Sequence, residues 1–469
     1  MLCNQRMRAW FALVAGFVAV SALLVSSNAS AVPSFGRQTG FACEACHTAF
    51  PELTPFGRRF KLNGYVLDNM QQVKTITAQN EEALLLNYIP PLSLMFQASY
   101  TRTKAALPDV TLPDGLAQNN QVLFPQQASL FYAGRIAPNF GGFIQITYDS
   151  ASGSFGFDNT DLRYANHMNL AGKDTIFGVT ANNNPTVQDV WNSTPAWQTP
   201  FDQRTSAAPV PAASALVDGS LGGDVAGLSA YLWFNDAFYV ELGAYRSAKQ
   251  GFQNPQTQNA GPLNSTASNV IDGVAPYWRL AYEWDWNRNA LSVGTYGLEA
   301  RLLPGNGIAL AGSINRFTDT ALDAQYQYLG DDHLFSVQTT WIHEKQRLDA
   351  SFAAGAAANP SDTLNTFRLG GSYYYRRRYG AALGYFTTTG STDAGLYNAG
   401  GGPVTGSVNN SPDSRGWIAE LDYLPWQNVK FALQYTIYNK FNGGTSNYDG
   451  FGRNASDNNT VYLLAWINF

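Results

Sequence analysis

Residues 429–441 read VKFALQYTIYNKF, and this stretch decides the fold. Its odd positions, such as Leu433, carry apolar side chains, whereas its even positions, such as Gln434, carry mostly polar or small ones. A period of two residues is typical of a β-strand, because successive side chains of a strand point to opposite faces. The stretches 238–245 and 278–286 repeat the pattern. The sequence therefore predicts strands with one apolar and one polar face.

The composition narrows the class of protein. Of the 469 residues only 13% are charged, whereas soluble globular proteins carry roughly 25%. The 43 Gly and 25 Tyr leave no room for repeated apolar helical spans of about 20 residues. The formal net charge is −5 and no basic block occurs, which argues against a nucleic-acid partner. An aromatic, weakly charged, β-rich chain of this kind is typical of an outer-membrane barrel.

Short turns and long loops alternate along the chain. The short turns are predicted at 137–140, 170–172, 235–237, 287–289, 330–332, 377–379 and 425–428. Polar segments rich in Gly, Asn, Ser and Pro separate them at 104–124, 151–157, 182–223, 250–276, 303–318, 347–363, 391–415 and 442–459. With the short turns in the periplasm and the long loops outside, residues 81–469 form about 16 antiparallel strands.

The fold class that follows is an all-β outer-membrane β-barrel, embedded in outer-membrane lipid, with a lumen wide enough to hold a plug. A soluble β-sandwich also alternates apolar and polar residues. We favour the barrel because the strands end in aromatic pairs and the connections alternate in length.

The chain begins with the features of a secretion signal. Arg6 and Arg8 precede an apolar run at residues 10–25, and an A-x-A cleavage site follows at residues 29–31. We therefore predict a signal peptide over residues 1–31.

The motif Cys43-Glu44-Ala45-Cys46-His47 is the C-x-x-C-H pattern of covalent haem attachment. Two thiols one short turn apart can form thioethers to a porphyrin, and the adjacent imidazole can then bind the iron as an axial ligand. A thioredoxin-like redox pair, half of a zinc site and a plain disulfide are the alternatives. The first has no βαβ context, the second has no further ligands nearby, and the third does not need His47. We predict one haem c.

Residues 32–80 are predicted to be a small monohaem c-type cytochrome domain that plugs the lumen. A segment this short needs a covalent cross-link or a bound metal to fold stably, and the haem would provide both. An electron does not cross an apolar band of about 25 Å unaided, so a haem inside the lumen gives a reason to fuse the two parts. The residues alone thus predict an electron conduit across an outer membrane.

The sixth ligand of the haem iron is open at this stage. Met70 is the methionine nearest to the motif in sequence, and we predict it as the second axial ligand, with an apolar filler as the alternative. Met95, His167 and Met168 could take that place only if a barrel side chain reached the haem.

Charged side chains near the motif and in the strands have predicted roles. Arg37, Arg58, Arg59 and Lys61 lie near the motif, where they could pair with haem propionates or merely solvate a small domain. We predict Arg37 and Arg58 as the propionate contacts. By strand parity, the carboxylates predicted to face the lumen are Glu241, Glu283, Asp285 and Glu299.

The long segment 182–223 is predicted to fold into the mouth of the barrel against the haem domain, because Trp191 and Trp197 need burial. A loop packed on its extracellular neighbours is the alternative. His333 and His343 lie near predicted strand ends, and we interpret them as interfacial side chains rather than metal ligands.

The N-terminal run also carries a family resemblance. Residues 33–48 read PSFGRQTGFACEACHT, residues 50–58 read FPELTPFGR and residues 60–65 read FKLNGY. Further stretches are NNNPTVQD at 182–189, WNSTPAW at 191–197 and DAQYQY at 323–328. Together they resemble the fused monohaem cytochrome-porins of iron-oxidising bacteria, over essentially the whole mature chain.

The resemblance implies an oxidoreductase of the outer membrane that oxidises extracellular Fe(II). It places one haem c on Cys43, Cys46 and His47 and implies electron delivery to a periplasmic c-type cytochrome or similar carrier. Two alternatives stay open: a conduit for another extracellular donor or acceptor, and a passive porin in which C-x-x-C-H is incidental.

Overall fold

The structure is a computed structural model. It describes residues 32–48, 52–76, 82–107, 120–150, 153–194, 208–248, 270–303, 314–398 and 400–469. The predicted signal peptide, residues 1–31, lies outside the described residues, and so does Trp197.

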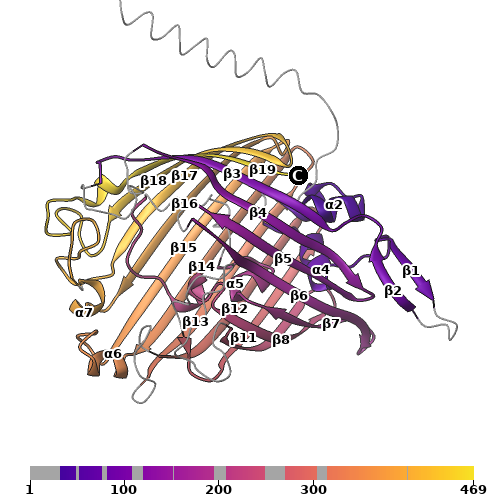
Figure 1. The fold of residues 1–469 in the computed structure, drawn as a ribbon, viewed down its shortest axis with the longest axis horizontal. Coiled ribbons are helices and arrows are strands. Elements are labelled where there is room, and N and C mark those ends of the chain that lie inside the picture. The colour runs from indigo at the N-terminus through magenta and orange to yellow at the C-terminus, as the bar shows by residue number, and fades with distance from the viewer. Residues whose placement is uncertain are drawn as a thin grey trace, which may run out of the picture.

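Sixteen long antiparallel strands close into one barrel (Figure 1). They are β3 (Leu92–Thr103), β4 (Gln121–Ala137), β5 (Phe140–Asp149), β6 (Ser154–Leu170), β7 (Lys173–Asn182), β8 (Val225–Phe234), β9 (Phe238–Ser247), β11 (Ala275–Trp286), β12 (Asn289–Leu303), β13 (Asn315–Leu329), β14 (His333–Arg347), β15 (Ser361–Tyr375), β16 (Tyr379–Gly390), β17 (Ser414–Trp426), β18 (Val429–Lys440) and β19 (Thr460–Asn468). Pairing of β19 with β3 and of β9 with β11 completes the ring, and the two-residue β10 (Val270–Ile271) pairs with β12. The predicted strand number is confirmed.

All seven predicted short turns join neighbouring strands of the barrel. The opposite end carries the short helices of the described long connections, which are α6 (Asp349–Ala353), α7 (Ala394–Tyr397) and η3 (Ala455–Asn458). In Figure 1, α6 and α7 are on the left, and the C-terminus lies at the other end. Short turns on one side and long loops on the other are the arrangement of outer-membrane barrels, whose short turns face the periplasm.

Three strands begin three residues before the last residue of a predicted loop. Strand β4 already begins at Gln121, β6 at Ser154 and β13 at Asn315. Pro125 lies within β4, although proline has no N–H to donate to a strand ladder. The register between β3 and β4 shifts between Gln97 and Ser99, close to Pro125, so the ladder continues on both sides of it.

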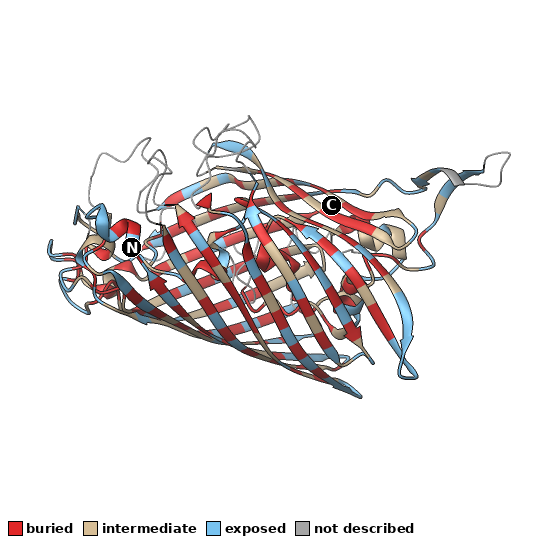
Figure 2. Cartoon of the chain, turned by 90° about the horizontal axis from the view of Figure 1, so that it is seen from below, coloured by how far each residue is buried: buried red, intermediate tan, exposed pale blue. Residues whose placement is uncertain are grey.

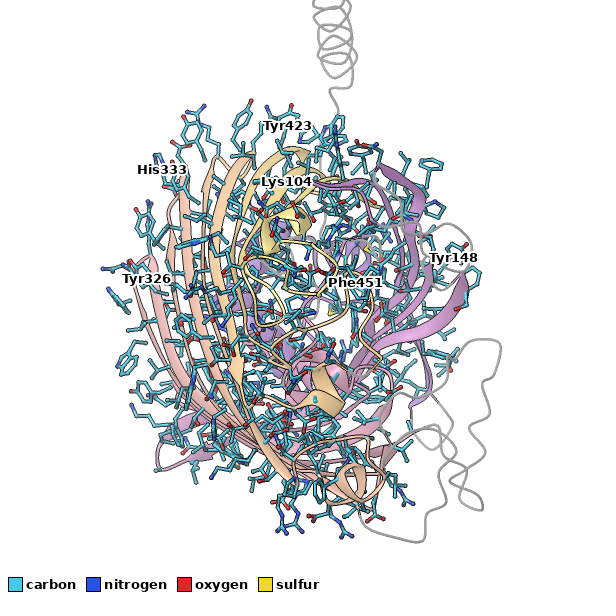
Figure 3. The ribbon with its side chains drawn as sticks, turned by 90° about the vertical axis from the view of Figure 1, so that its left-hand side faces the viewer. Lys104, Tyr148, Tyr326, His333, Tyr423 and Phe451 are labelled. Atoms are coloured by element: carbon cyan, nitrogen blue, oxygen red, sulfur yellow. The ribbon has the colours of Figure 1, made fainter. Side chains whose placement is uncertain are left out.

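The two faces of the wall differ as the parity predicts. Leu421, Leu433 and Leu463 lie side by side in register on three strands and are exposed on the outside, whereas Gln434 is buried. Figure 2 shows the resulting alternation of buried and exposed residues along each strand. Figure 3 shows Tyr326 pointing away from the wall. An apolar outer face over a polar lumen is what a lipid-facing barrel requires.

The prediction for the lumen carboxylates is right in part. Glu241 and Glu283 are buried inside, and Asp285 follows Glu283 on the same face but is exposed near the end of β11. The prediction for Glu299 is wrong. It stands six residues after the outward Val293, so the two-residue period puts it on the outer face, where it pairs with an arginine of the next strand at 3.6 Å.

Three short helices occupy the lumen near the short-turn end: α2 (Pro33–Thr39), α3 (Cys43–Cys46) and α4 (Pro55–Leu62) (Figure 1). Proline at the first position favours the start of α4, and the Thr54 side chain caps it by accepting from the N–H of Gly57 at 3.1 Å. The Ser34 hydroxyl of α2 donates to the carbonyl of Ala133 in the wall at 2.8 Å. No helix among the described residues is both long and apolar enough to span a membrane.

A hairpin of β1 (Gln72–Ile76) and β2 (Glu82–Asn87) projects beyond the barrel at the short-turn end (Figures 1 and 2). The Asn87 amide donates to the carbonyl of Arg135 in β4 at 2.6 Å and fixes the base of the hairpin. Two further short elements, α5 (Pro185–Gln188) and η2 (Leu216–Ser220), belong to the connection between β7 and β8.

A charge on the outer face should destabilise the barrel. We expect Leu433→Arg to lower the free energy of unfolding in lipid by about 2–4 kcal/mol, because an arginine near the middle of the apolar band loses its hydration. Phe451→Arg is the control, since Phe451 is 63% exposed in the long connection after β18. Urea unfolding in vesicles measures both, and equal effects would show that Leu433 does not face lipid.

Candidate functional site

A cavity lies where the N-terminal helices meet the barrel wall. It encloses about 1130 Å³ of space, part of it open to solvent. The motif residues Cys43, Cys46 and His47 line it.

Most of the remaining lining is apolar and comes from segments far apart in sequence. Phe35 and Phe60 belong to the N-terminal helices, while Phe131, Phe143 and Trp466 belong to β4, β5 and β19. The rings of Phe35 and Phe60 meet edge to face, with their centroids 5.1 Å apart. A largely apolar lining of this kind favours a ligand with a large apolar surface.

Local hydrogen bonds set the shape of the C-x-x-C-H segment. Helix α3 is a single turn in which the His47 N–H donates to the carbonyl of Cys43 at 2.9 Å. The Thr54 N–H donates to the carbonyl of Cys46 at 2.9 Å and joins the motif to α4. Gly57 allows this approach, since a Cβ there would lie 2.3 Å from the Cys46 carbonyl oxygen.

Both cysteines are free thiols. Burial raises the pKa of Cys43 to about 12 and that of Cys46 to about 11. A reactive thioredoxin-like pair has a lowered thiol pKa, so neutral buried thiols argue against that alternative. Among the described residues, no group of three or more His, Cys, Asp or Glu is arranged to hold a metal ion.

The predicted arginines are both placed outside the cavity lining. Arg37 donates to the carbonyl of Leu92 and ties α2 to the start of β3. Arg58 donates to the carbonyl of Leu53 at 2.7 Å and is buried among polar side chains of the wall. Their contacts with haem propionates stay predictions.

Lys61 is the basic residue that lines the cavity. It donates to the carbonyl of Val187 and lies 3.7 Å from the carboxylate of Asp161. Burial lowers its pKa to about 8. The sequence placed it beside the motif but had no signal to separate it from the neighbouring arginines.

The two methionines near the motif have different positions. Met70, predicted as an axial ligand, is buried but does not line the cavity. Its sulfur accepts from the N–H of Leu67 at 3.4 Å. Met95 of β3 lines the cavity together with His47.

The described part of the connection that follows β7, residues 183–194, folds inward, as predicted. Val187 and Asn192 line the cavity, and Trp191 is buried. The Trp191 indole donates to Glu283 at 3.0 Å, and the guanidinium of Arg279 lies 4.8 Å from the centre of its ring.

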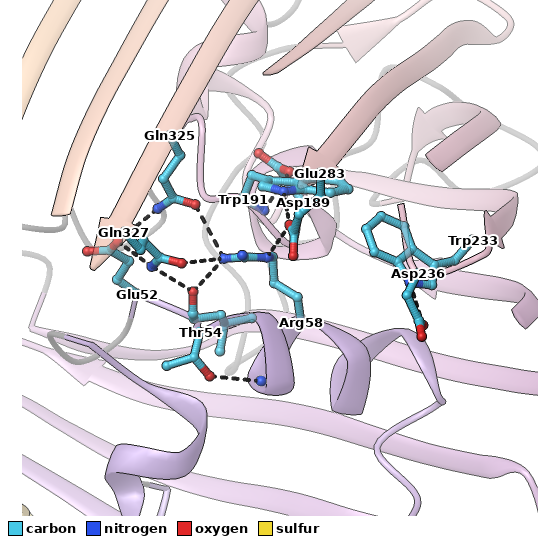
Figure 4. A network of polar contacts seen from close by, with 12 residues as sticks. Glu52, Thr54, Arg58, Asp189, Trp191, Trp233, Asp236, Glu283, Gln325 and Gln327 are labelled. Atoms are coloured by element: carbon cyan, nitrogen blue, oxygen red, sulfur yellow. Dashed lines mark hydrogen bonds and ion pairs between the residues drawn. The ribbon is translucent and has the colours of Figure 1, made fainter. Parts of the chain in front are cut away.

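Buried polar contacts join the N-terminal helices α2, α3 and α4, which we call the plug, to the barrel wall (Figure 4). Arg58 forms an ion pair with Glu283 at 2.8 Å and donates to the Gln327 side chain at 3.0 Å. Glu52 accepts from Gln325 and Gln327 at 2.8 and 2.7 Å. Each charge has a partner, which a buried ion pair requires.

The remaining histidines have partners on the wall or at its rim. His333 contacts the Tyr373 hydroxyl at 2.7 Å, and His343 contacts the Asn365 side chain at 2.8 Å. His167 lies 3.0 Å from a carboxylate oxygen of Asp174 and is exposed. None of the three lines the cavity, and neither does Met168.

Comparison with models of known protein families and with curated protein sequences gives no match. Among solved structures, OmpF of Salmonella typhi in complex with daunomycin matches with a TM-score of 0.45 and 11% identity, covering 81% of this chain and 97% of that one. The outer-membrane channel DcaP of Acinetobacter baumannii matches with a TM-score of 0.44, 12% identity and coverage of 81% and 96%. An anion-selective porin from Comamonas acidovorans matches with a TM-score of 0.42, 12% identity and coverage of 80% and 97%.

The fold class of this chain rests on its own strand pairing. Sixteen strands, an apolar outer face and a polar lumen make it a porin-like β-barrel of the outer membrane, in contact with outer-membrane lipid.

Two adjacent arginines of α4 test the plug contacts. We expect Arg58→Gln to lower the free energy of unfolding by about 3–5 kcal/mol, because it leaves Glu283 as a buried unpaired charge. Arg59→Gln should cost under about 1 kcal/mol, since Arg59 is half exposed in its pair with Asp236.

Thermal unfolding followed by circular dichroism gives both values, and the rate of protease cleavage in the N-terminal segment reports release of the plug. Similar losses in the two variants would mean that the buried pair does not anchor the plug.

Proposed function

We propose that the chain is an outer-membrane oxidoreductase that carries electrons through one haem c held inside the barrel. The observation that supports this is the cavity itself, in which both thiols and the imidazole of C-x-x-C-H line one apolar space in the lumen. The proposal includes membership of the cytochrome-porin group that the sequence resembles.

The residues present fit a haem. Cys43 and Cys46 would hold it through thioethers, and His47 would bind its iron. The bound group would supply one reversible electron. The aromatic lining provides an apolar surface for the porphyrin, and Lys61 supplies a positive charge at the cavity, where it can offset the carboxylates of a porphyrin.

In the proposed reaction Fe(II) is oxidised to Fe(III) at the cell surface, and a periplasmic c-type cytochrome or similar one-electron carrier is reduced. The position of the cavity supports electron delivery to a periplasmic carrier. Trp466 and Asn468 at the end of β19 line it, so it lies at the short-turn end that faces the periplasm.

A solute channel is the second candidate. The closed barrel with a polar lumen favours it, because porins are built on this fold. The short-turn end of this lumen holds three helices and the inward-folded segment around Trp191, which narrows any path for solutes.

A haem stain and a spectrum separate the candidates. We expect the full chain, exported with haem-attachment machinery and purified in detergent, to retain haem on a denaturing gel and to become reduced when Fe(II) is added. Cys43→Ala with Cys46→Ala should remove the stained haem, because no thioether can form. Leu433→Ala is the control for folding and export.

Each outcome decides something. An unstained wild type would leave the channel as the function. A stained protein that Fe(II) fails to reduce, but another donor or acceptor does convert, would keep the conduit and discard iron oxidation.

A further inference from the structure

The lining of the cavity offers candidates for the second ligand of the proposed haem iron. In the proposed site His47 would bind the haem iron, and a second ligand atom would have to come from another residue of the lining. Outside the motif, four lining residues carry a thioether, an amine, a phenol or a carboxylate, which are groups able to bind iron. They are Lys61, Tyr65, Met95 and Asp189.

Three of the four are already engaged. Lys61 donates to the carbonyl of Val187. The Tyr65 hydroxyl donates to Asp161 at 2.6 Å. Asp189 accepts from the N–H groups of Trp191 and Ser193 at 3.0 and 2.8 Å. To bind a metal, each would have to break a buried hydrogen bond, at a cost of about 1–3 kcal/mol for the group left unpaired.

Met95 is different. It is 2% exposed and lies on the inner face of β3, in the same apolar cluster as Phe131, Phe143 and Trp466. Its sulfur accepts a long hydrogen bond from the Gln97 side-chain amide at 3.8 Å. A neutral thioether loses little on leaving such a contact, and methionine adapts its three side-chain torsions to the space available.

Met70 provides the contrast within the same chain. It is also 2% exposed and belongs to the same apolar cluster. Its sulfur, however, accepts from the Leu67 N–H in the turn that follows α4, and the residue stands outside the cavity lining.

We propose that Met95 of the barrel wall, not Met70 of the N-terminal segment, is the second axial ligand of the haem iron. This inference rests on the proposed function. A wall ligand joins the cytochrome segment to the barrel through the iron, so the redox site is complete only when β3 and the plug are both in place. Methionine opposite histidine also raises the reduction potential, which suits acceptance of electrons from a weak reductant such as Fe(II).

The test uses two substitutions of equal size in the full-length, haem-loaded protein. Met95→Leu and Met70→Leu each keep the side-chain volume, so folding should be little affected. We expect Met95→Leu to keep its covalent haem, to lose the far-red sulfur-to-iron absorption band of the oxidised protein and to shift the midpoint potential downward. Met70→Leu should keep both the band and the potential.

A third variant keeps the test decisive if Met95→Leu does not fold. Met95→His offers another ligand from the same position and should give a six-coordinate bis-histidine spectrum at a lower potential. Loss of the band in Met70→Leu alone, or unchanged spectra in both Met95 variants, would overturn the assignment.

The wild type separates this inference from the proposed function. Covalent haem without the sulfur-to-iron band overturns the Met95 ligand and leaves the electron-transfer role standing. A wild type without haem overturns both.

Discussion

Closure of the barrel is the constraint on which the rest of this structure depends. Sixteen strands leave a lumen too wide to be filled by wall side chains alone, and every polar group inside it needs a partner. The N-terminal helices and the segment around Trp191 fill the short-turn end. The Arg58–Glu283 pair connects one to the other, because the same carboxylate also accepts from the Trp191 indole.

The cavity is the space that remains between these inserted segments and the barrel wall. Its lining comes from the N-terminal helices, from the connection after β7 and from strands at both ends of the barrel sequence. A redox group placed there would contact aromatic side chains of the wall and would lie near the end of the barrel that carries the short turns. The proposed electron transfer and the proposed Met95 ligand thus use the same packing that holds the plug.

Local rules of the chain made much of the fold predictable. The seven short turns and the outward face of strands such as β18 follow from turn residues and a two-residue period, which act over a few neighbours. The prediction for Glu299 failed because the two-residue period assigns a face only when it is counted from a residue whose face is known. Val293 faces outward, and counting from it places Glu299 on the outer face. The inward course of Trp191 could be predicted because a large indole needs burial.

The sequence by itself determined the wall, the strand number and the C-x-x-C-H motif, because each depends on residues close together along the chain. Only the tertiary structure decided which distant side chains meet at that motif. Met70 is nearer than Met95 in sequence, yet Met95 lines the cavity and Met70 does not. Arg58 was a candidate for the site, but Lys61 reaches it, because α4 turns Arg58 toward Glu283. Strand pairing sets these neighbours across long separations, and such contacts leave no local pattern to be recognised.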